Sequence, residues 1–282
     1  MSFIRTMTMT NHKHWLTAIE DGIFWIKLNR PDKKNAFSDE VGIELYKILE
    51  EDVEGNLENI RVVVLGTTQD EIFCSGADIA WFNTLNEPKG RQASINAQLV
   101  FDKFEKLPVP TIAAIKGLNL TAGFELMMCC DIIIAADNAK FGQIETKYGL
   151  TPCGGGTQRL VRLVGPLKAK ELIFTARIFS AQEALDIGLL NYLVPLEQLD
   201  DKVKEIAGRM IKNSGRAIKL SKRLIHMGTY INAQGFLMEG DAFADDFASK
   251  EPYQIFMEFF KEVQRKKKEA RDKKRAERAQ NQ

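Results

Sequence analysis

The sequence predicts an α/β fold, with a core of alternating strands and helices followed by a mainly helical C-terminal third. The first observation is that short, apolar, β-prone runs alternate with stretches of helical periodicity over residues 15–136. The second is that strand-like runs fade after Gly156 while helical ones continue. The third is composition, since 282 residues with 45% hydrophobic and 27% charged side chains can bury a substantial core.

The core begins with a β-prone run at residues 24–28, which ends at the turn sequence Asn-Arg-Pro. Ser38 is a candidate N-cap for an amphipathic helix that continues to about residue 54. Further buried strands are expected at residues 62–66, 72–76, 111–115 and 131–136, with a helix through residues 101–104 and a short helix between the last two strands. This order is typical of an α/β protein.

Helical periodicity dominates the C-terminal third of the chain. Helices are expected at residues 157–164, 167–175, 181–187, 197–213 and beyond 215, and a last one runs from about residue 252 into a basic tail. We therefore expect a poorly ordered lead-in at residues 1–14, an α/β core at 15–200, a helical region at 201–260 and a basic helical tail at 261–282.

The charge of the chain is nearly balanced, with a formal net charge of +1. Such a balance favours neither nucleic acid nor a membrane surface as the partner of the whole molecule. Residues 261–278, however, hold ten basic and four acidic side chains, so the rest of the chain is mildly acidic. We interpret this tail as a solvated extension of the last helix, and RNA or an acidic partner as the alternative. Its lack of aromatic residues argues against recognition of single strands by stacking.

Cysteine and histidine are too sparse for several kinds of site. The four cysteines form no Cys-x-x-Cys pair, which favours buried, reduced thiols over disulfides. Only three histidines occur and two lie in the lead-in, which argues against a histidine triad and against a metal site. Apolar runs are too short for a membrane helix, and the start lacks the apolar stretch of a secretory signal. We expect a cytoplasmic protein.

Three loops with small residues follow expected strands. They cover residues 74–79, 116–126 and 151–160. Glycine and alanine at such junctions let a ligand approach the backbone, and free N–H groups at a helix start favour negative charge. Two N–H groups that converge on one oxygen would form an oxyanion hole. The third loop lacks the Gly-Lys-Ser/Thr of a phosphate-binding loop, so nucleotide binding is not expected there.

Several short motifs occur in a fixed order around these loops. They are Leu-Asn-Arg-Pro (28–31) with Asn-Ala (35–36), Ser-Gly-Ala-Asp-Ile (75–79), Pro110 with Thr-Ile-Ala-Ala-Ile-Lys-Gly (111–117), Gly-Phe-Glu-Leu (123–126), Cys-Asp (130–131), Phe-Gly-Gln (141–143) with Glu145, Gly-Gly-Thr-Gln-Arg-Leu (155–160), and Ser-Ala-Gln-Glu-Ala (180–184) with Gly-Leu (188–189). Together these segments resemble the enoyl-CoA hydratase/isomerase (crotonase) superfamily over about residues 15–260.

The resemblance implies a spiral of ββα units with a helical C-terminal region that drives trimerisation, and trimers that can pair into hexamers. It also implies an acyl-CoA thioester as substrate, with neither a metal nor a redox cofactor. The backbone N–H groups of Ala77 and Ala122 would hold the thioester oxygen. Coenzyme A would contact the residues Lys33, Lys34, Ala36, Ala77, Asp78 and Ile79.

Glu125 and Glu145 occupy the two acidic positions that hydratases of this family use. A polarised thioester makes C3 electrophilic, so one carboxylate can activate water and a protonated partner can deliver a proton to C2. Two carboxyls that share a site raise each other's proton affinity. The resemblance implies Glu145 as the proton donor and Glu125 as the group that holds the water. Taken singly, each would be an ordinary helix or loop glutamate.

Four positions depart from the usual family pattern. Thr121 stands where a glycine is common and Cys153 likewise, and we expect both to line the acyl pocket. With no histidine base in view, Cys153 is not expected to act as a nucleophile. Ala80 replaces a frequent lysine, which removes one phosphate contact. The segment 252–255 also differs from the usual pattern. Because of these changes, the motifs do not identify the acyl group of the substrate.

The sequence therefore predicts an enoyl-CoA hydratase that adds water syn across a trans-2-enoyl-CoA to give a 3-hydroxyacyl-CoA. Within the superfamily, the alternatives are an enoyl-CoA isomerase, a specialised acyl-CoA dehydratase or a cyclic dienoyl-CoA hydratase. Glu125 argues against simple isomerisation, for which Glu145 alone would suffice. An alternative of another class is an RNA-binding protein built on the same scaffold and its basic tail.

Overall fold

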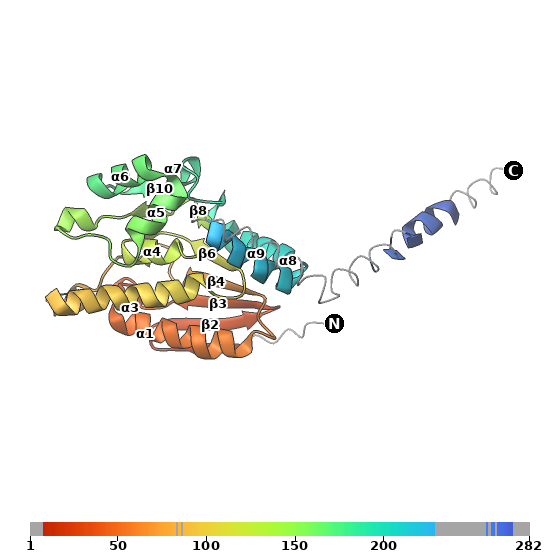
Figure 1. The fold of residues 1–282 in the computed structure, drawn as a ribbon, viewed down its shortest axis with the longest axis horizontal. Coiled ribbons are helices and arrows are strands. Elements are labelled where there is room, and N and C mark those ends of the chain that lie inside the picture. Colours follow the sequence, from red (N-terminus) through yellow and green to blue (C-terminus); the bar gives the residue numbers. More distant parts are fainter. Residues whose placement is uncertain are drawn as a thin grey trace. The chain divides into compact units, whose positions relative to one another are not determined.

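The computed structural model describes residues 8–82, 84–85, 87–228, 258, 261–262 and 264–272. The chain divides into two compact units, residues 1–219 and residues 220–282 (Figure 1). The first seven residues of the expected lead-in, most of the helix expected from residue 252, and the tail beyond residue 272 lie outside the described residues.

A seven-stranded sheet forms the base of the first unit. Its order is β1-β2-β3-β4-β6-β8-β11, in which β1, β2 and β3 pair antiparallel and the following strands pair parallel. The strands are β1 (Thr8–Asn11), β2 (Trp15–Glu20), β3 (Ile23–Leu28), β4 (Val62–Thr67), β6 (Thr111–Ile115), β8 (Ile132–Ala136) and β11 (Tyr192–Val194). β1 lies within the expected lead-in, where residues 8–11 gain order by pairing with β2.

A second, four-stranded sheet has the order β10-β9-β7-β5. Its strands are β5 (Ile72–Cys74), β7 (Leu118–Leu120), β9 (Lys140–Gly142) and β10 (Phe179–Ser180). Each of the pairs β4/β5, β6/β7 and β8/β9 sends its first strand to the large sheet and its second strand to the small one. A helical segment follows each pair, so three successive turns of the chain form a ββα spiral. The predicted α/β class is confirmed.

Alternation along the central strands divides the core into two layers. Val62 and Val64 of β4 pack in a cluster with Val203 and Ile206 of α8 (Leu199–Ile211), on one face of the sheet. The intervening residues of β4 belong to a larger cluster that also includes side chains of α1 (Asp39–Lys47) and α3 (Glu87–Glu105). Figure 1 shows α1 and α3 side by side.

Most expected helices are present. The remaining ones are α2 (Ile79–Phe82), α4 (Ala122–Met127), α5 (Gly156–Val164), α6 (Pro166–Thr175), α7 (Ala181–Asp186) and α9 (Gly215–Gly228). Ser38 is the N-cap residue of α1, but its side chain makes no cap hydrogen bond. The helix expected to reach residue 54 changes to a π-helix at Ile48–Val53 and a 3-10 turn at Glu54–Asn56. The short strands β7, β9, β10 and β11 were not predicted, because two or three residues show no strand periodicity. No strand was assigned at β1 or β2 either.

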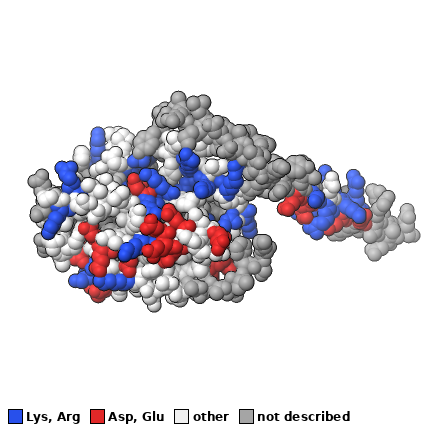
Figure 2. Space-filling model, turned by 60° about the horizontal axis from the view of Figure 1, so that its bottom comes forward, with Lys and Arg blue, Asp and Glu red and all other residues white. Residues whose placement is uncertain are grey.

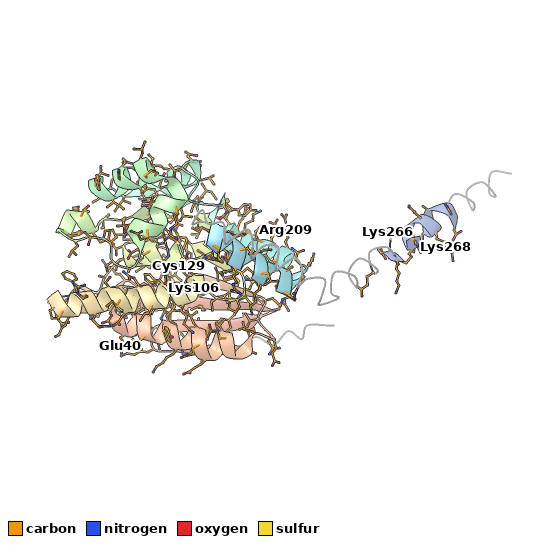
Figure 3. All side chains as sticks on the ribbon, in the orientation of Figure 1. Glu40, Lys106, Cys129, Arg209, Lys266 and Lys268 are labelled. Atoms are coloured by element: carbon orange, nitrogen blue, oxygen red, sulfur yellow. The ribbon has the colours of Figure 1, made fainter. Side chains whose placement is uncertain are left out.

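The surface carries both signs of charge. Figure 2 shows acidic and basic side chains interspersed over the visible face and on the described part of the tail. In that part, Arg265 pairs with Glu262 and Glu269 at helical spacing, while Figure 3 shows Lys266 and Lys268 on the same helical segment. Among the described residues, no helix is long and apolar enough to cross a membrane.

Candidate active site

The ends of three neighbouring strands define one edge of the small sheet. β5, β7 and β9 pair parallel and side by side, so the segments that follow them leave the sheet at the same edge. These segments are residues 75–78 before α2, Thr121 before α4, and residues 143–145 before the 3-10 turn Glu145–Tyr148. Ligands of α/β proteins commonly bind at the carboxyl ends of parallel strands. The spiral thus brings together segments that are distant in sequence.

Close backbone packing joins the first two segments. A Cβ atom added to Gly123 would lie 2.3 Å from the Cβ of Cys74, so α4 can begin against β5 only with glycine there. Likewise, a Cβ on Gly76 would lie 2.7 Å from Thr121 Oγ1. The loop after β5 is also fixed by Phe37, whose N–H donates to Gly76 O and whose carbonyl accepts from Asp78 N, both at 2.7 Å.

Ala77 and Ala122 stand on either side of this contact. The bridge to Phe37 uses the carbonyl of Gly76 and the N–H of Asp78, which leaves the N–H of the exposed Ala77 outside it. Ala122 is the first residue of α4, where the N–H groups have no acceptor within the helix. The two N–H groups that the sequence singled out therefore belong to neighbouring backbone segments.

Glu125 lies in the first turn of α4 and is only 2% exposed. Its Oε1 accepts hydrogen bonds from Gly154 N at 2.9 Å and from Gly156 N at 2.8 Å. Burial, and then the charge of Glu145, raises the pKa of Glu125 to about 7, although the two N–H groups favour the charged form. One oxygen is thus fixed by the backbone, in a group that gains or loses its proton near neutrality.

Glu145 begins the turn after β9 and is half-buried. Its Oε1 accepts a hydrogen bond from Gln143 Nε2 at 2.7 Å. Its Oε2 is buried and has no hydrogen-bond partner among the residues that the structure describes. Burial raises the pKa of Glu145 to about 7, against the lowering effect of its own N–H and of the Gln143 amide.

Gly156 adjoins the Glu125 carboxyl and the Gln143 amide. A Cβ on this residue would lie 2.8 Å from Glu125 Oε1 and 2.9 Å from Gln143 Nε2, the group that holds Glu145. A Cβ on Gly154 would lie 2.8 Å from Glu125 Oε2. Both positions require glycine because a side chain there would collide with the Glu125 carboxyl and, at Gly156, with the Gln143 amide.

Arg159 of α5 holds the loop that contains Gly154. Its Nη1 donates to Gly154 O at 2.8 Å, its Nε to Glu105 Oε2 at 2.8 Å, and its Nη2 to Asp102 Oδ1 at 2.7 Å. The side chain is 8% exposed, so the two acidic residues of α3 compensate a buried charge. Neither Arg159 nor Gln143 was assigned a role from the sequence, although both lie in the motifs quoted above.

The residues expected to contact coenzyme A form a less enclosed group. Lys33 and Lys34 are exposed and Ala36 is buried. The Asp78 carboxylate is already engaged, since it pairs with Arg30 Nη1 at 2.8 Å and accepts from Ala80 N at 2.9 Å. Burial would raise the pKa of Asp78, but hydrogen bonds from the backbone and from Arg30 outweigh it and lower the pKa. Ile79 starts α2.

Cys153 and Thr121, the two expected acyl-pocket residues, both adjoin the glutamates. Cys153 is exposed as a residue, but partial burial of its thiol, followed by the charges of Glu125 and Glu145, raises the pKa of that thiol to about 12. A thiol with a raised pKa is a poor nucleophile at neutral pH. Thr121 donates its N–H to Gly142 O at 2.9 Å, which ties the start of α4 to β9.

Comparison with known proteins identifies the family. The family model described as enoyl-CoA hydratase/isomerase matches residues 18–268. The chain belongs to this family. It is 38% identical to a crotonyl-CoA hydratase from Syntrophomonas wolfei over 82% of this chain and 89% of that protein. It is 40% identical to a short-chain-enoyl-CoA hydratase from Clostridium acetobutylicum over 80% of this chain and 86% of that protein.

The fold agrees as well. A crystal structure of an enoyl-CoA hydratase from Bacillus anthracis matches with a TM-score of 0.79 and 36% identity, covering 89% of this chain and 96% of that one. The resemblance inferred from the motifs is confirmed, as is the crotonase-like spiral. The prediction of an enzyme of the hydro-lyase class is confirmed too.

Proposed function

We propose that this enzyme adds water to a short trans-2-enoyl-CoA, of the crotonyl-CoA type, to give the 3-hydroxyacyl-CoA. The observation that carries the proposal is the pair of carboxyl groups, Glu125 and Glu145, which are close enough for the charge of Glu145 to raise the pKa of Glu125 and which each have a pKa of about 7. The two curated hydratases named above support a short acyl group.

In the proposed reaction, the N–H groups of Ala77 and Ala122 bind the thioester oxygen and draw electron density from C3. Glu125, as a carboxylate, takes a proton from the water whose oxygen bonds to C3. The electron pair of the C2–C3 double bond moves to C2, where the proton of Glu145 adds. One water is consumed: Glu125 gains one proton and Glu145 gives one up, so the total number of protons on the pair is unchanged and the addition needs no redox cofactor.

The arrangement of partners supports these two roles. The Oε1 atom of Glu125 accepts two backbone N–H groups, which favours its charged form. Oε2 of Glu145 is buried without a partner among the described residues, which suits a protonated carboxyl that donates to a bound substrate. With both pKa values near 7, the pair holds about one proton at neutral pH.

The remaining assignments belong to the same proposal. Lys33 and Lys34 attract the phosphates of coenzyme A as exposed cations, and its adenine end lies against residues 77–79. Thr121 and Cys153 limit the acyl group. We also propose a homotrimer that can pair into a hexamer, and a cytoplasmic location.

A panel of thioesters tests the function. The wild-type protein should consume crotonyl-CoA, followed as loss of the conjugated thioester absorbance, faster than a branched or a cyclic enoyl-CoA. A 3-enoyl-CoA separates hydration from isomerisation, because isomerisation creates conjugation and raises the absorbance. Glu145→Gln should lose hydration while it still binds the product CoA ester in calorimetry. A Glu145→Gln variant with near-normal turnover would overturn the proposal.

A further inference from the structure

Thr121 holds a backbone conformation that a threonine rarely adopts. Its φ is 47° and its ψ is −114°, immediately before the first residue of α4. A β-branched residue at positive φ is an outlier, because its side chain crowds the backbone. Such strain concentrates at functional sites, where the surrounding structure enforces it.

The hydroxyl of Thr121 adds a second unfavourable feature. Oγ1 is buried and has no hydrogen-bond partner within the part of the chain that the structure describes. It lies against Gly76, at 2.7 Å from the position of a Cβ on that residue. A buried hydroxyl without a partner is destabilising, since it has lost its bonds to water.

The backbone of Thr121 does not explain the side chain. Its N–H donates to Gly142 O at 2.9 Å, and its carbonyl accepts from Glu125 N at 2.8 Å. A glycine would make the same two bonds at the same φ without strain. The backbone bonds therefore do not require a threonine here, and the hydroxyl of its side chain makes no hydrogen bond among the described residues of the free enzyme.

The position of the hydroxyl indicates its partner. Gly76, which Oγ1 contacts, is bonded directly to the nitrogen of Ala77, and the carbonyl carbon of Thr121 is bonded to the nitrogen of Ala122. Oγ1 therefore lies beside the backbone segment that leads into Ala77 and belongs to the residue before Ala122, the two residues whose N–H groups the proposed function assigns to the thioester oxygen. A hydroxyl is also a donor, with a rotatable hydrogen.

We propose that the Thr121 hydroxyl is a third hydrogen-bond donor to the thioester oxygen, a further catalytic group of this chain. The inference rests on the proposed thioester site. A third donor stabilises the enolate more than the neutral thioester, since hydrogen bonds strengthen as negative charge develops on the acceptor. The bound substrate thus supplies the partner that the free hydroxyl lacks.

Acetoacetyl-CoA is a suitable probe, because its enolate carries charge on the same oxygen and has its own ultraviolet absorbance. Thr121→Val keeps the branched shape but removes the donor, while Thr121→Ser keeps the donor. We expect Thr121→Val to bind the enolate at least tenfold more weakly and to lower kcat for crotonyl-CoA by about ten- to a hundredfold, in the range of one oxyanion donor. Thr121→Ser should retain most of both activities.

Stability provides the control for a merely structural role. Because the hydroxyl has no partner among the described residues, Thr121→Val should leave the Tm of the free enzyme unchanged or higher. Thr175→Val removes an exposed hydroxyl that donates to Glu171 O at 2.7 Å at the end of α6, and it should leave enolate binding unaltered. Equal losses in Thr121→Ser and Thr121→Val, or none in either, would overturn the inference.

The outcome also separates this inference from the proposed function. If the wild-type protein binds the enolate but hydrates no thioester, the proposed reaction fails, and weaker enolate binding by Thr121→Val still supports the third donor. If the wild-type protein binds no acetoacetyl-CoA, the third donor is refuted with the thioester site.

Discussion

The two glutamates of the site occupy unlike surroundings. Glu125 is enclosed, with one oxygen fixed by the N–H groups of Gly154 and Gly156 and with Arg159 behind that loop. Glu145 is half-buried, with a single amide partner and one buried oxygen that has none among the described residues. Even so, burial raises both pKa values to about 7.

The difference shows how one pair of like residues can divide two tasks. Backbone donors favour the carboxylate at Glu125, where water must lose a proton. The sparse surroundings of Glu145 leave an oxygen free to give a proton to a ligand. Because similar pKa values arise from different sets of contacts, each side can be perturbed separately.

Removal of either carboxyl should have the largest effect. Glu125→Gln and Glu145→Gln should each lower kcat by about 10²- to 10⁴-fold, the usual range for a general acid or base. The double variant should be only slightly worse than either single one, because groups that act as a unit are not additive. Steady-state kinetics with crotonyl-CoA measures this. Fully multiplicative losses would show that the two groups act independently.

Removal of Arg159, which holds the loop that binds Glu125, should have the second largest effect. Arg159→Gln leaves Glu105 and Asp102 without their buried partner and frees the carbonyl of Gly154. We expect a loss of about 3 kcal/mol in the free energy of unfolding and a drop in kcat of at least roughly tenfold as the loop loosens.

Arg177→Gln is the matched control. Arg177 also pairs with two carboxylates, Glu171 and Glu183, but its side chain is 33% exposed compared with 8% for Arg159. Its loss should cost about 1 kcal/mol or less and leave kcat unchanged. Urea unfolding and kinetics of both variants test the contrast. Equal effects at the two positions would contradict the role given to the loop.

The arginine shows where prediction from sequence ended. The longer buried strands and most helices could be predicted, because periodicity reports local structure, and the ordered motifs singled out the two glutamates through the family resemblance. The support at Arg159 could not, since Glu105 and Asp102 lie on α3 and reach it only through the fold. A long-range ion pair leaves no periodic signal in a single sequence.

The backbone strain at Thr121 could not be predicted from the sequence either. The sequence marked the residue as a departure from the family pattern, but a φ of 47° follows from the packing of α4 against β5 and β9. The order of residues 8–11 depends likewise on pairing with β2, although the lead-in has no strong strand pattern. In each case tertiary contact decided the local conformation.

The raised pKa values predict a definite dependence on pH. Folding lifts the pKa of Glu125 and of Glu145 from 4.5 to about 7. A carboxyl of this kind stabilises the fold below pH 4.5, and that contribution is lost as the pH rises to 7. At pH 8, Glu125→Gln should therefore be more stable than wild type, by on the order of 1 to 3 kcal/mol, and at pH 5 the gain should be much smaller.

Thermal unfolding from pH 5 to 8 measures this gain, with the exposed Glu197→Gln as the control that should follow wild type. Activity should follow a bell-shaped curve centred near pH 7, because the reaction needs one proton on the pair. If Glu125→Gln were less stable than wild type at pH 8, the cost of burying the charged Glu125 carboxylate would be smaller than the stability gained from its hydrogen bonds.

Loss of the hydrogen bond from Gln143 to Glu145 should have the smallest effect on activity. Gln143→Leu removes the side-chain amide that donates to Glu145 Oε1, and we expect kcat/KM to fall by about tenfold, the equivalent of one hydrogen bond to a charged group. Because that bond lowers the pKa of Glu145, its loss should move the corresponding limb of the pH profile to higher pH. Gln182→Leu removes a similar bond to Asp186 between two exposed side chains of α7 and should change neither quantity. If this limb moved to lower pH instead, Gln143 would stabilise the protonated form of Glu145 rather than its carboxylate. The contrast drawn above between the two glutamates would then be wrong.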